Sequence, residues 1–127
     1  MNDRRLHVAG RLRSFVYAGR GVLLMLRTQQ NAWLHAAATV LAIGLGAWLG
    51  IDRGQWCWII AAIVAVWTAE ALNTAFEFLC DVASPAFHPQ VEKAKDVSAG
   101  AVLISAGGAL AIGLIVFGPR LWERLVS

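Results

Sequence analysis

Three long apolar runs limit what this sequence can fold into. They cover residues 31–50, 56–80 and 97–117, and the first and third contain no Asp, Glu, Lys or Arg. A helix of about 20 residues spans the hydrocarbon core of a bilayer. Only 15% of the 127 residues are charged, against about 25% in a soluble globular domain. We therefore expect one all-α integral membrane domain over residues 1–127, with three spanning helices.

Short segments separate the three runs. Residues 51–55 (I-D-R-G-Q) allow only a turn between two adjacent helices. A turn containing Pro85 and Pro89 follows the second run, and Gly118-Pro119 follows the third. Because glycine and proline commonly mark helix ends, this last pair predicts that the third spanning helix stops there.

The first 30 residues have a different pattern, which predicts an amphipathic surface helix over about residues 11–28. Apolar residues recur there at helical spacing, and Arg13, Arg20 and Arg27 are seven residues apart, so they share one flank. A basic amphipathic helix lies in the membrane interface. The apolar stretch 21–26 is too short for the hydrophobic region of a signal peptide.

Basic residues are unevenly distributed between the two sides of the expected bundle. One side carries six arginines of the N-terminal segment and two lysines of the second loop; the other carries three arginines (Arg4, Arg5, Arg11, Arg13, Arg20, Arg27, Lys93 and Lys95, against Arg53, Arg120 and Arg124). Positive charge favours the cytoplasmic side. We expect a cytoplasmic N-terminus and second loop, membrane lipids as partners, and no nucleic-acid partner.

The second run contains a polar stripe that is costly to place in a membrane. Glu70, Asn73, Glu77 and Asp81 recur at helical spacing, and Glu70 and Glu77 differ by only about 20° around a helix. An ionised carboxylate at the bilayer centre costs about 2.5–3.5 kcal/mol on insertion scales. Intramembrane carboxylates are functional by default, so the stripe is the candidate site.

The residues that follow the stripe indicate two possible kinds of chemistry. Lys95 and Asp96 should lie at the same membrane face as Glu77 and Asp81. Carboxylates hold Mg²⁺, cations neutralise phosphate charge, and a carboxylate can accept a hydroxyl proton, as phosphoryl transfer requires. The same cluster could serve ion transport. The sequence contains no G-x-x-x-x-G-K-[ST], G-x-G-x-x-G or H-E-x-x-H motif.

The order of these residues resembles that of a known family. Residues 70–103 (E-A-L-N-T-A-F-E-F-L-C-D-V-A-S-P-A-F-H-P-Q-V-E-K-A-K-D-V-S-A-G-A-V-L) resemble the small prokaryotic diacylglycerol kinases, which include undecaprenol kinase. F-V-Y-A-G-R-G-V at residues 15–22 is similar to the family's surface-helix motif, and Asn31 with His35 resembles its N-x-x-x-H entry to the first span. The resemblance covers roughly residues 11–117.

The resemblance implies a homotrimeric helix bundle with active sites between subunits, in the bacterial inner membrane. Its implied activity is the transfer of phosphate from ATP, with Mg²⁺, to diacylglycerol or undecaprenol. The segments 84–89 (S-P-A-F-H-P) and 94–103 (A-K-D-V-S-A-G-A-V-L) are slightly more similar to the undecaprenol branch. The alternative is a non-catalytic or ion-conducting trimer with a degenerate kinase site.

The resemblance also implies roles for individual residues. Glu70 would be the general base, Asn73 would orient the reacting groups, and Glu77 would bind Mg²⁺. Lys95 would contact the ATP phosphates, supported by Asp96. Further positions implied to lie against the nucleotide are Tyr17, Gly21, Phe87 and His88.

One position departs from the family pattern. Gln29 stands where the family often has a glutamate that partners Glu77 in binding metal. An amide oxygen can still coordinate Mg²⁺ but brings no negative charge, so weaker Mg²⁺ binding is expected. The family's arginine near the nucleotide has two candidates here, Arg11 and Arg13, although a solvated basic face is the role that we expect for either.

Overall fold

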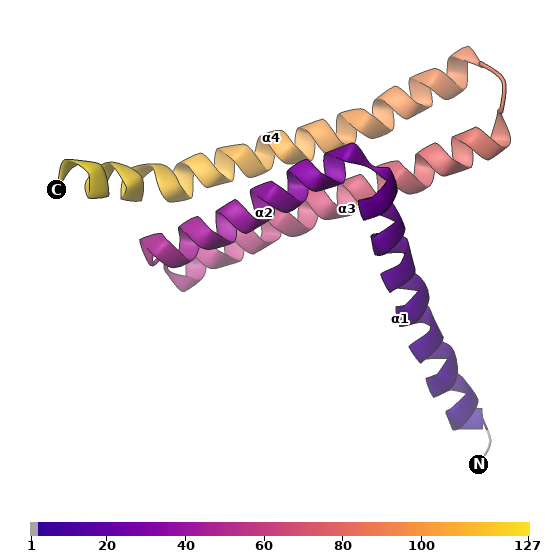
Figure 1. Cartoon of the computed structure of the whole chain (residues 1–127), viewed down its shortest axis with the longest axis horizontal. Helices are drawn as coiled ribbons and strands as arrows, with labels where there is room; N and C mark the ends of the chain where they lie inside the picture. The colour runs from indigo at the N-terminus through magenta and orange to yellow at the C-terminus, as the bar shows by residue number, and fades with distance from the viewer. Residues whose placement is uncertain (1–2) are drawn as a thin grey trace.

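The structure, a computed structural model, describes the backbone of residues 3–127 and the side chains of residues 10–127. It consists of four helices: α1 (Asp3–Thr28), α2 (Gln30–Leu49), α3 (Arg53–Ala83) and α4 (Pro89–Val126). The last three lie side by side, while α1 leaves the bundle at a steep angle (Figure 1). The expectation of an all-α chain is confirmed. Arg4 and Arg5, counted above among the basic residues, lie outside the described side chains.

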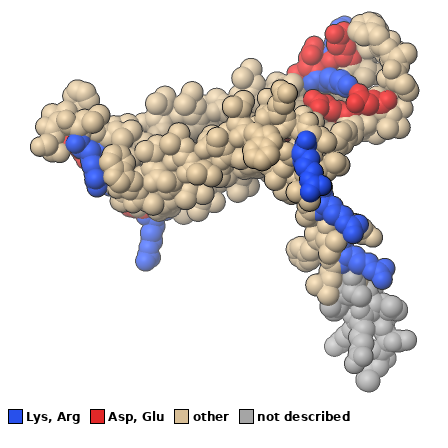
Figure 2. Space-filling view, in the orientation of Figure 1, with Lys and Arg blue, Asp and Glu red and all other residues tan. Residues whose placement is uncertain are grey.

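Helices α2, α3 and α4 are each long and apolar enough to cross a membrane. Helix α2 has 20 residues, which corresponds to a length of about 30 Å and so to the thickness of a bilayer's hydrocarbon core. Helices α3 and α4, with 31 and 38 residues, extend beyond the start of α2 (Figure 1). Charged side chains gather at the two ends of the bundle and along α1, and the visible middle has none (Figure 2).

The turn between α2 and α3 is built from local hydrogen bonds. Gly50 ends α2 with φ 63° and ψ 46°, a left-handed conformation that glycine adopts without strain. Asp52 begins α3 with a reciprocal cap: its carboxylate accepts from the Gln55 amide, and the Gln55 side chain accepts from the Asp52 amide. Helix α3 therefore begins at Arg53, three residues earlier than the apolar run suggested.

The ends of α2, α3 and α4 at this turn share the main apolar cluster. Leu49, Ile51, Ile59, Val116 and Phe117 are its buried members. Close packing of α2 on α3 depends on Gly46, where an added Cβ atom would come within 2.7 Å of the Trp56 ring. The core of the chain thus lies at the end of the bundle opposite the α3–α4 loop (Figure 1).

The prediction that the third spanning helix stops at Gly118-Pro119 is wrong, because α4 continues through Pro119 to Val126. Proline removes one backbone donor from a helix, yet contacts beyond it favour the helical path. Arg120 Nη1 donates to the Gly50 carbonyl at 3.3 Å, and Arg124 Nη2 to the Trp48 carbonyl at 3.4 Å. The Arg124 guanidinium also lies 5.0 Å from the Trp48 ring centroid. These contacts hold the last turns of α4 against the α2–α3 turn.

Helices α1 and α4 also begin earlier than predicted. Helix α1 begins at Asp3 instead of near residue 11, and α4 begins at Pro89 instead of near residue 97. Pro89 occupies the first turn of α4, where a missing N–H has no cost. His88 caps this helix, because its Nδ1 accepts from the Gln90 amide at 3.2 Å.

Candidate active site

Glu70 is the most unusual side chain of the structure. It lies in the middle of α3, and none of its surface is exposed. Neither carboxylate oxygen has a hydrogen-bond partner. The nearest ionisable group is His35 of α2, whose Nε2 lies 3.4 Å from Glu70 Oε2. A buried charge without full compensation destabilises a fold, so this carboxylate is a strong candidate for a functional group.

A second polar cluster surrounds Glu77, which lies two turns beyond Glu70. Gln29 Nε2 donates to Glu77 Oε2 at 3.1 Å, and Asn73 Nδ2 donates to Glu77 Oε1 at 3.2 Å. The hydroxyl of Ser98 on α4 donates to Asn73 Oδ1 at 2.6 Å. The cluster therefore joins the α1–α2 link, α3 and α4 around one carboxylate. Because Gln29 immediately precedes α2, Glu77 lies level with one end of that helix, and Glu70 lies about 10 Å deeper.

The last member of the stripe pairs with α4. Lys95 Nζ lies 2.5 Å from Asp81 Oδ1, and the two side chains are 38% and 64% exposed. Exposed ion pairs contribute little to stability because water screens them. Lys95 can therefore leave Asp81 at little cost when a more negative group approaches.

The four stripe residues thus differ steeply in burial. Glu70 and Asn73 are buried, Glu77 is half-buried and Asp81 is exposed. Each of the four contacts another segment of the chain. The pairs are Glu70 with His35, Asn73 with Ser98, Glu77 with Gln29, and Asp81 with Lys95. The stripe predicted from spacing thus turns toward the neighbouring helices.

The remaining predicted site residues lie apart from these two clusters. Tyr17 on α1 is exposed, and the Arg20 guanidinium carbon lies over its ring, 5.9 Å from the ring centroid. Gly21 lines a shallow apolar groove between α1 and α3. Phe87 is 77% exposed in the α3–α4 loop, next to the helix-capping His88. Asp96 is exposed on α4. Within residues 10–127, the structure records no hydrogen bond or ion pair joining any of them to Glu70 or Glu77.

The structure also brings in two partners to which the sequence analysis gave no role. Ser98 fixes the amide of Asn73, and His35 faces Glu70. Ser98 carried no signal, because serine is common in helices of this composition. The N-x-x-x-H pattern had marked His35, but only the packing of α2 on α3 shows which carboxylate it meets.

The Glu77 cluster fits a hard divalent cation. Carboxylate and amide oxygens are ligand types that such cations accept, and Mg²⁺ is commonly held by one or two carboxylates together with substrate phosphates. Amide oxygen and nitrogen positions are interchangeable by a flip, so Gln29 can turn its oxygen toward the space beside Glu77. In the described part of the chain, no three His, Cys, Asp or Glu residues gather at one point. The site therefore suits a cation that a second ligand also holds.

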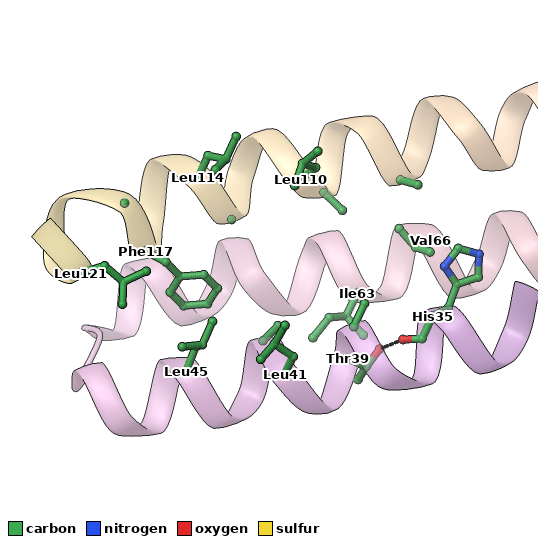
Figure 3. A pocket seen from close by; sticks show the side chains of 16 residues that line it. His35, Thr39, Leu41, Leu45, Ile63, Val66, Leu110, Leu114, Phe117 and Leu121 are labelled. Carbon is green, nitrogen blue, oxygen red and sulfur yellow. Dashed lines mark hydrogen bonds between the residues drawn. The ribbon is translucent and has the colours of Figure 1, made fainter.

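An apolar groove leads away from the buried carboxylate. It lies between α2 and α4 on the face of α3, has a volume of about 400 Å³, and ends at His35 (Figure 3). Apart from His35 and Thr39, its lining is aliphatic, aromatic or glycine, including Leu41, Leu110 and Phe117. The groove can accommodate a hydrocarbon chain whose polar end lies near Glu70.

Comparison with known proteins identifies the family. The family model for prokaryotic diacylglycerol kinase matches residues 16–117. The chain is 36% identical over 119 residues to the undecaprenol kinase of Bacillus subtilis (strain 168), covering 94% of this chain and 97% of that protein. It is 30% identical over 100 residues to the diacylglycerol kinase of Escherichia coli (strain K12), covering 73% of this chain and 79% of that protein. The chain belongs to the prokaryotic diacylglycerol kinase family and is a lipid kinase.

Proposed function

We propose that this lipid kinase transfers the terminal phosphoryl group of ATP to the hydroxyl group of a membrane lipid alcohol, with Glu70 as the general base. The observation that carries the proposal is a fully buried carboxylate, without any hydrogen bond, on a helix able to span a membrane. Such a group is shielded from water and could accept the proton of a hydroxyl embedded in the bilayer. Family membership supports the same reaction.

Asn73 would orient the reacting groups. It lies one turn from Glu70 on α3, and hydrogen bonds to Ser98 and Glu77 fix its amide. Because both partners are part of the site, the amide links the position of the base to that of the phosphate-binding cluster. Preorganised polar groups of this kind supply much of the rate enhancement in phosphoryl transfer.

The nucleotide would bind at the cytoplasmic end of this stripe. Glu77 and Gln29 would hold Mg²⁺, which neutralises charge on the ATP phosphates when bound. Lys95, held only by an exposed pair with Asp81, would contact the phosphates, with Asp96 supporting it. Tyr17, Gly21, Phe87 and His88 would lie around the rest of the nucleotide, as the family resemblance implies.

We also propose the inner membrane as the location, with the N-terminus and active site cytoplasmic. The basic flank of α1 and the lysines near the α3–α4 loop support this orientation. The steep angle of α1 to the bundle supports a surface helix lying along the membrane (Figure 1). A homotrimer is supported by a shallow groove between α3 and α4, where Ala65, Thr68 and Ala69 lie beside Asn73. Small residues let helices approach closely in lipid.

Undecaprenol is the lipid alcohol that we propose as the preferred substrate. The match to the undecaprenol kinase covers nearly all of both chains, and the apolar groove that ends at His35 has room for a narrow chain. The test offers undecaprenol and diacylglycerol together to the purified protein with γ-labelled ATP. We expect kcat/KM for undecaprenol to exceed that for diacylglycerol by about tenfold or more, because contacts in an apolar pocket that differ by about 1–3 kcal/mol give about 10–200-fold discrimination. A preference for diacylglycerol would overturn the substrate assignment.

The glutamine at position 29 gives a separate prediction about Mg²⁺. Gln29→Glu should lower the Mg²⁺ concentration for half-maximal rate by about tenfold, because a second carboxylate would then face Glu77. The measurement is the lipid phosphorylation rate across a Mg²⁺ titration. Gln30→Glu is the matched control. Gln30 is exposed, and its substitution adds the same negative charge one residue away. An unchanged Mg²⁺ requirement in Gln29→Glu would remove Gln29 from the metal site.

A further inference from the structure

His35 is an ionisable side chain next to the buried base, and the proposed function leaves it without a role. Its Nε2 atom lies 3.4 Å from Glu70 Oε2, and only 14% of its side chain is exposed. Neither this nitrogen nor either oxygen of Glu70 has a hydrogen-bond partner. Buried polar atoms are nearly always paired in native proteins. The polar atoms of Glu70 and His35 therefore each have the other side chain as their polar neighbour.

Packing between α2 and α3 holds the imidazole in place. The Trp67 ring meets the His35 ring edge-on, with centroids 6.2 Å apart and planes at 69°. Trp67 Nε1 donates to the Thr39 hydroxyl at 3.0 Å, and this hydroxyl donates to the His35 carbonyl at 2.7 Å. Figure 3 shows the ring at the end of the apolar groove, one turn from Thr39. The ring thus has a defined orientation at the point where the groove meets the carboxylate.

The contact favours a proton on Nε2 of the imidazole. A lone pair on Nε2 would repel an ionised carboxylate at this distance, whereas an N–H directed at Oε2 attracts it. We infer that His35 is the positioning residue of the general base: its Nε2–H faces Oε2 of Glu70 and turns the other oxygen toward the lipid hydroxyl. This inference rests on the proposed function, because it presumes that Glu70 accepts that proton.

Two amide substitutions that differ by one methylene test the inference. His35→Gln retains an N–H donor at about the reach of Nε2, whereas His35→Asn carries the same amide too far back to meet Glu70. We expect kcat to fall about 100-fold in His35→Asn and to stay within about tenfold of the unmodified protein in His35→Gln. KM for ATP should change little in either variant, because the Glu77 cluster is intact. Lipid phosphorylation rates across ATP and lipid concentrations provide these values.

Ile59→Val is the control for disturbed packing. It removes one methylene group from the buried cluster at the far end of the bundle and leaves His35 and its neighbours intact, so kcat should stay within about threefold while the unfolding temperature falls. Equal kcat values in the Gln and Asn variants, or a loss confined to KM for ATP, would overturn the role of His35. Absence of lipid phosphorylation in the unmodified protein would overturn the proposed function instead, so the two failures are distinguishable.

Discussion

Glu70→Gln is expected to lower kcat for lipid phosphorylation by about 10²–10⁴-fold, the usual contribution of a general base. The amide has nearly the shape of the carboxylate but cannot accept the hydroxyl proton. The thermal unfolding temperature should stay the same or rise, because Glu70 is fully buried without hydrogen bonds and a neutral amide is less costly to bury than a charge. The Glu70→Gln variant should therefore lose activity without losing stability.

Glu123→Gln is the matched control for this substitution. Glu123 is exposed on α4, near the end of the bundle opposite the α3–α4 loop (Figure 1), and the change removes the same charge. Its kcat should equal that of the unmodified protein. A Glu70→Gln variant that keeps kcat within threefold would exclude Glu70 as the base, whatever its effect on stability.

Glu77→Gln is expected to give the second large effect, a change in the Mg²⁺ requirement and in kcat/KM for ATP. This carboxylate is the acidic member of a cluster whose other members are the amides of Gln29 and Asn73. Without it the site holds no negative charge, so the Mg²⁺ concentration for half-maximal rate should rise at least about tenfold and kcat/KM for ATP should fall about 100-fold. Rates measured across Mg²⁺ and ATP titrations give both values.

Glu92→Gln serves as the control for Glu77→Gln. Glu92 is exposed in the first turn of α4, on the same side of the proposed membrane, so the variant loses the same surface charge. It should leave both titrations unchanged. Equal Mg²⁺ requirements for Glu77→Gln and the unmodified protein would place the metal site elsewhere.

Much of the fold and half of the site could be predicted from the sequence. The apolar runs predicted the three long helices, because hydrophobic length and spacing are local properties. The same local spacing predicted that Glu70 and Glu77 share a face of α3. Their partners depend on how α3 packs against α2 and α4, which no local pattern encodes. The Glu70–His35 and Asn73–Ser98 contacts therefore emerged only from the structure.

Helix ends were the least predictable feature, for a related reason. Pro119 removes a donor from α4, and local rules therefore favour an end there. Contacts of Arg120 and Arg124 with Gly50 and Trp48, some 70 residues earlier, outweigh that preference. The roles of Tyr17, Phe87 and Asp96 stay predictions, since they concern a nucleotide rather than contacts within the chain.

The most direct measurement of the central claim is phosphate transfer by the purified, unmodified protein in lipid bilayers, with γ-labelled ATP and a panel of lipid alcohols that includes undecaprenol and diacylglycerol. We expect a labelled lipid phosphate that forms only with Mg²⁺ present and is lost when Glu70 is replaced. A folded protein that labels no lipid alcohol in the panel, or that labels one equally well without Glu70, would contradict it.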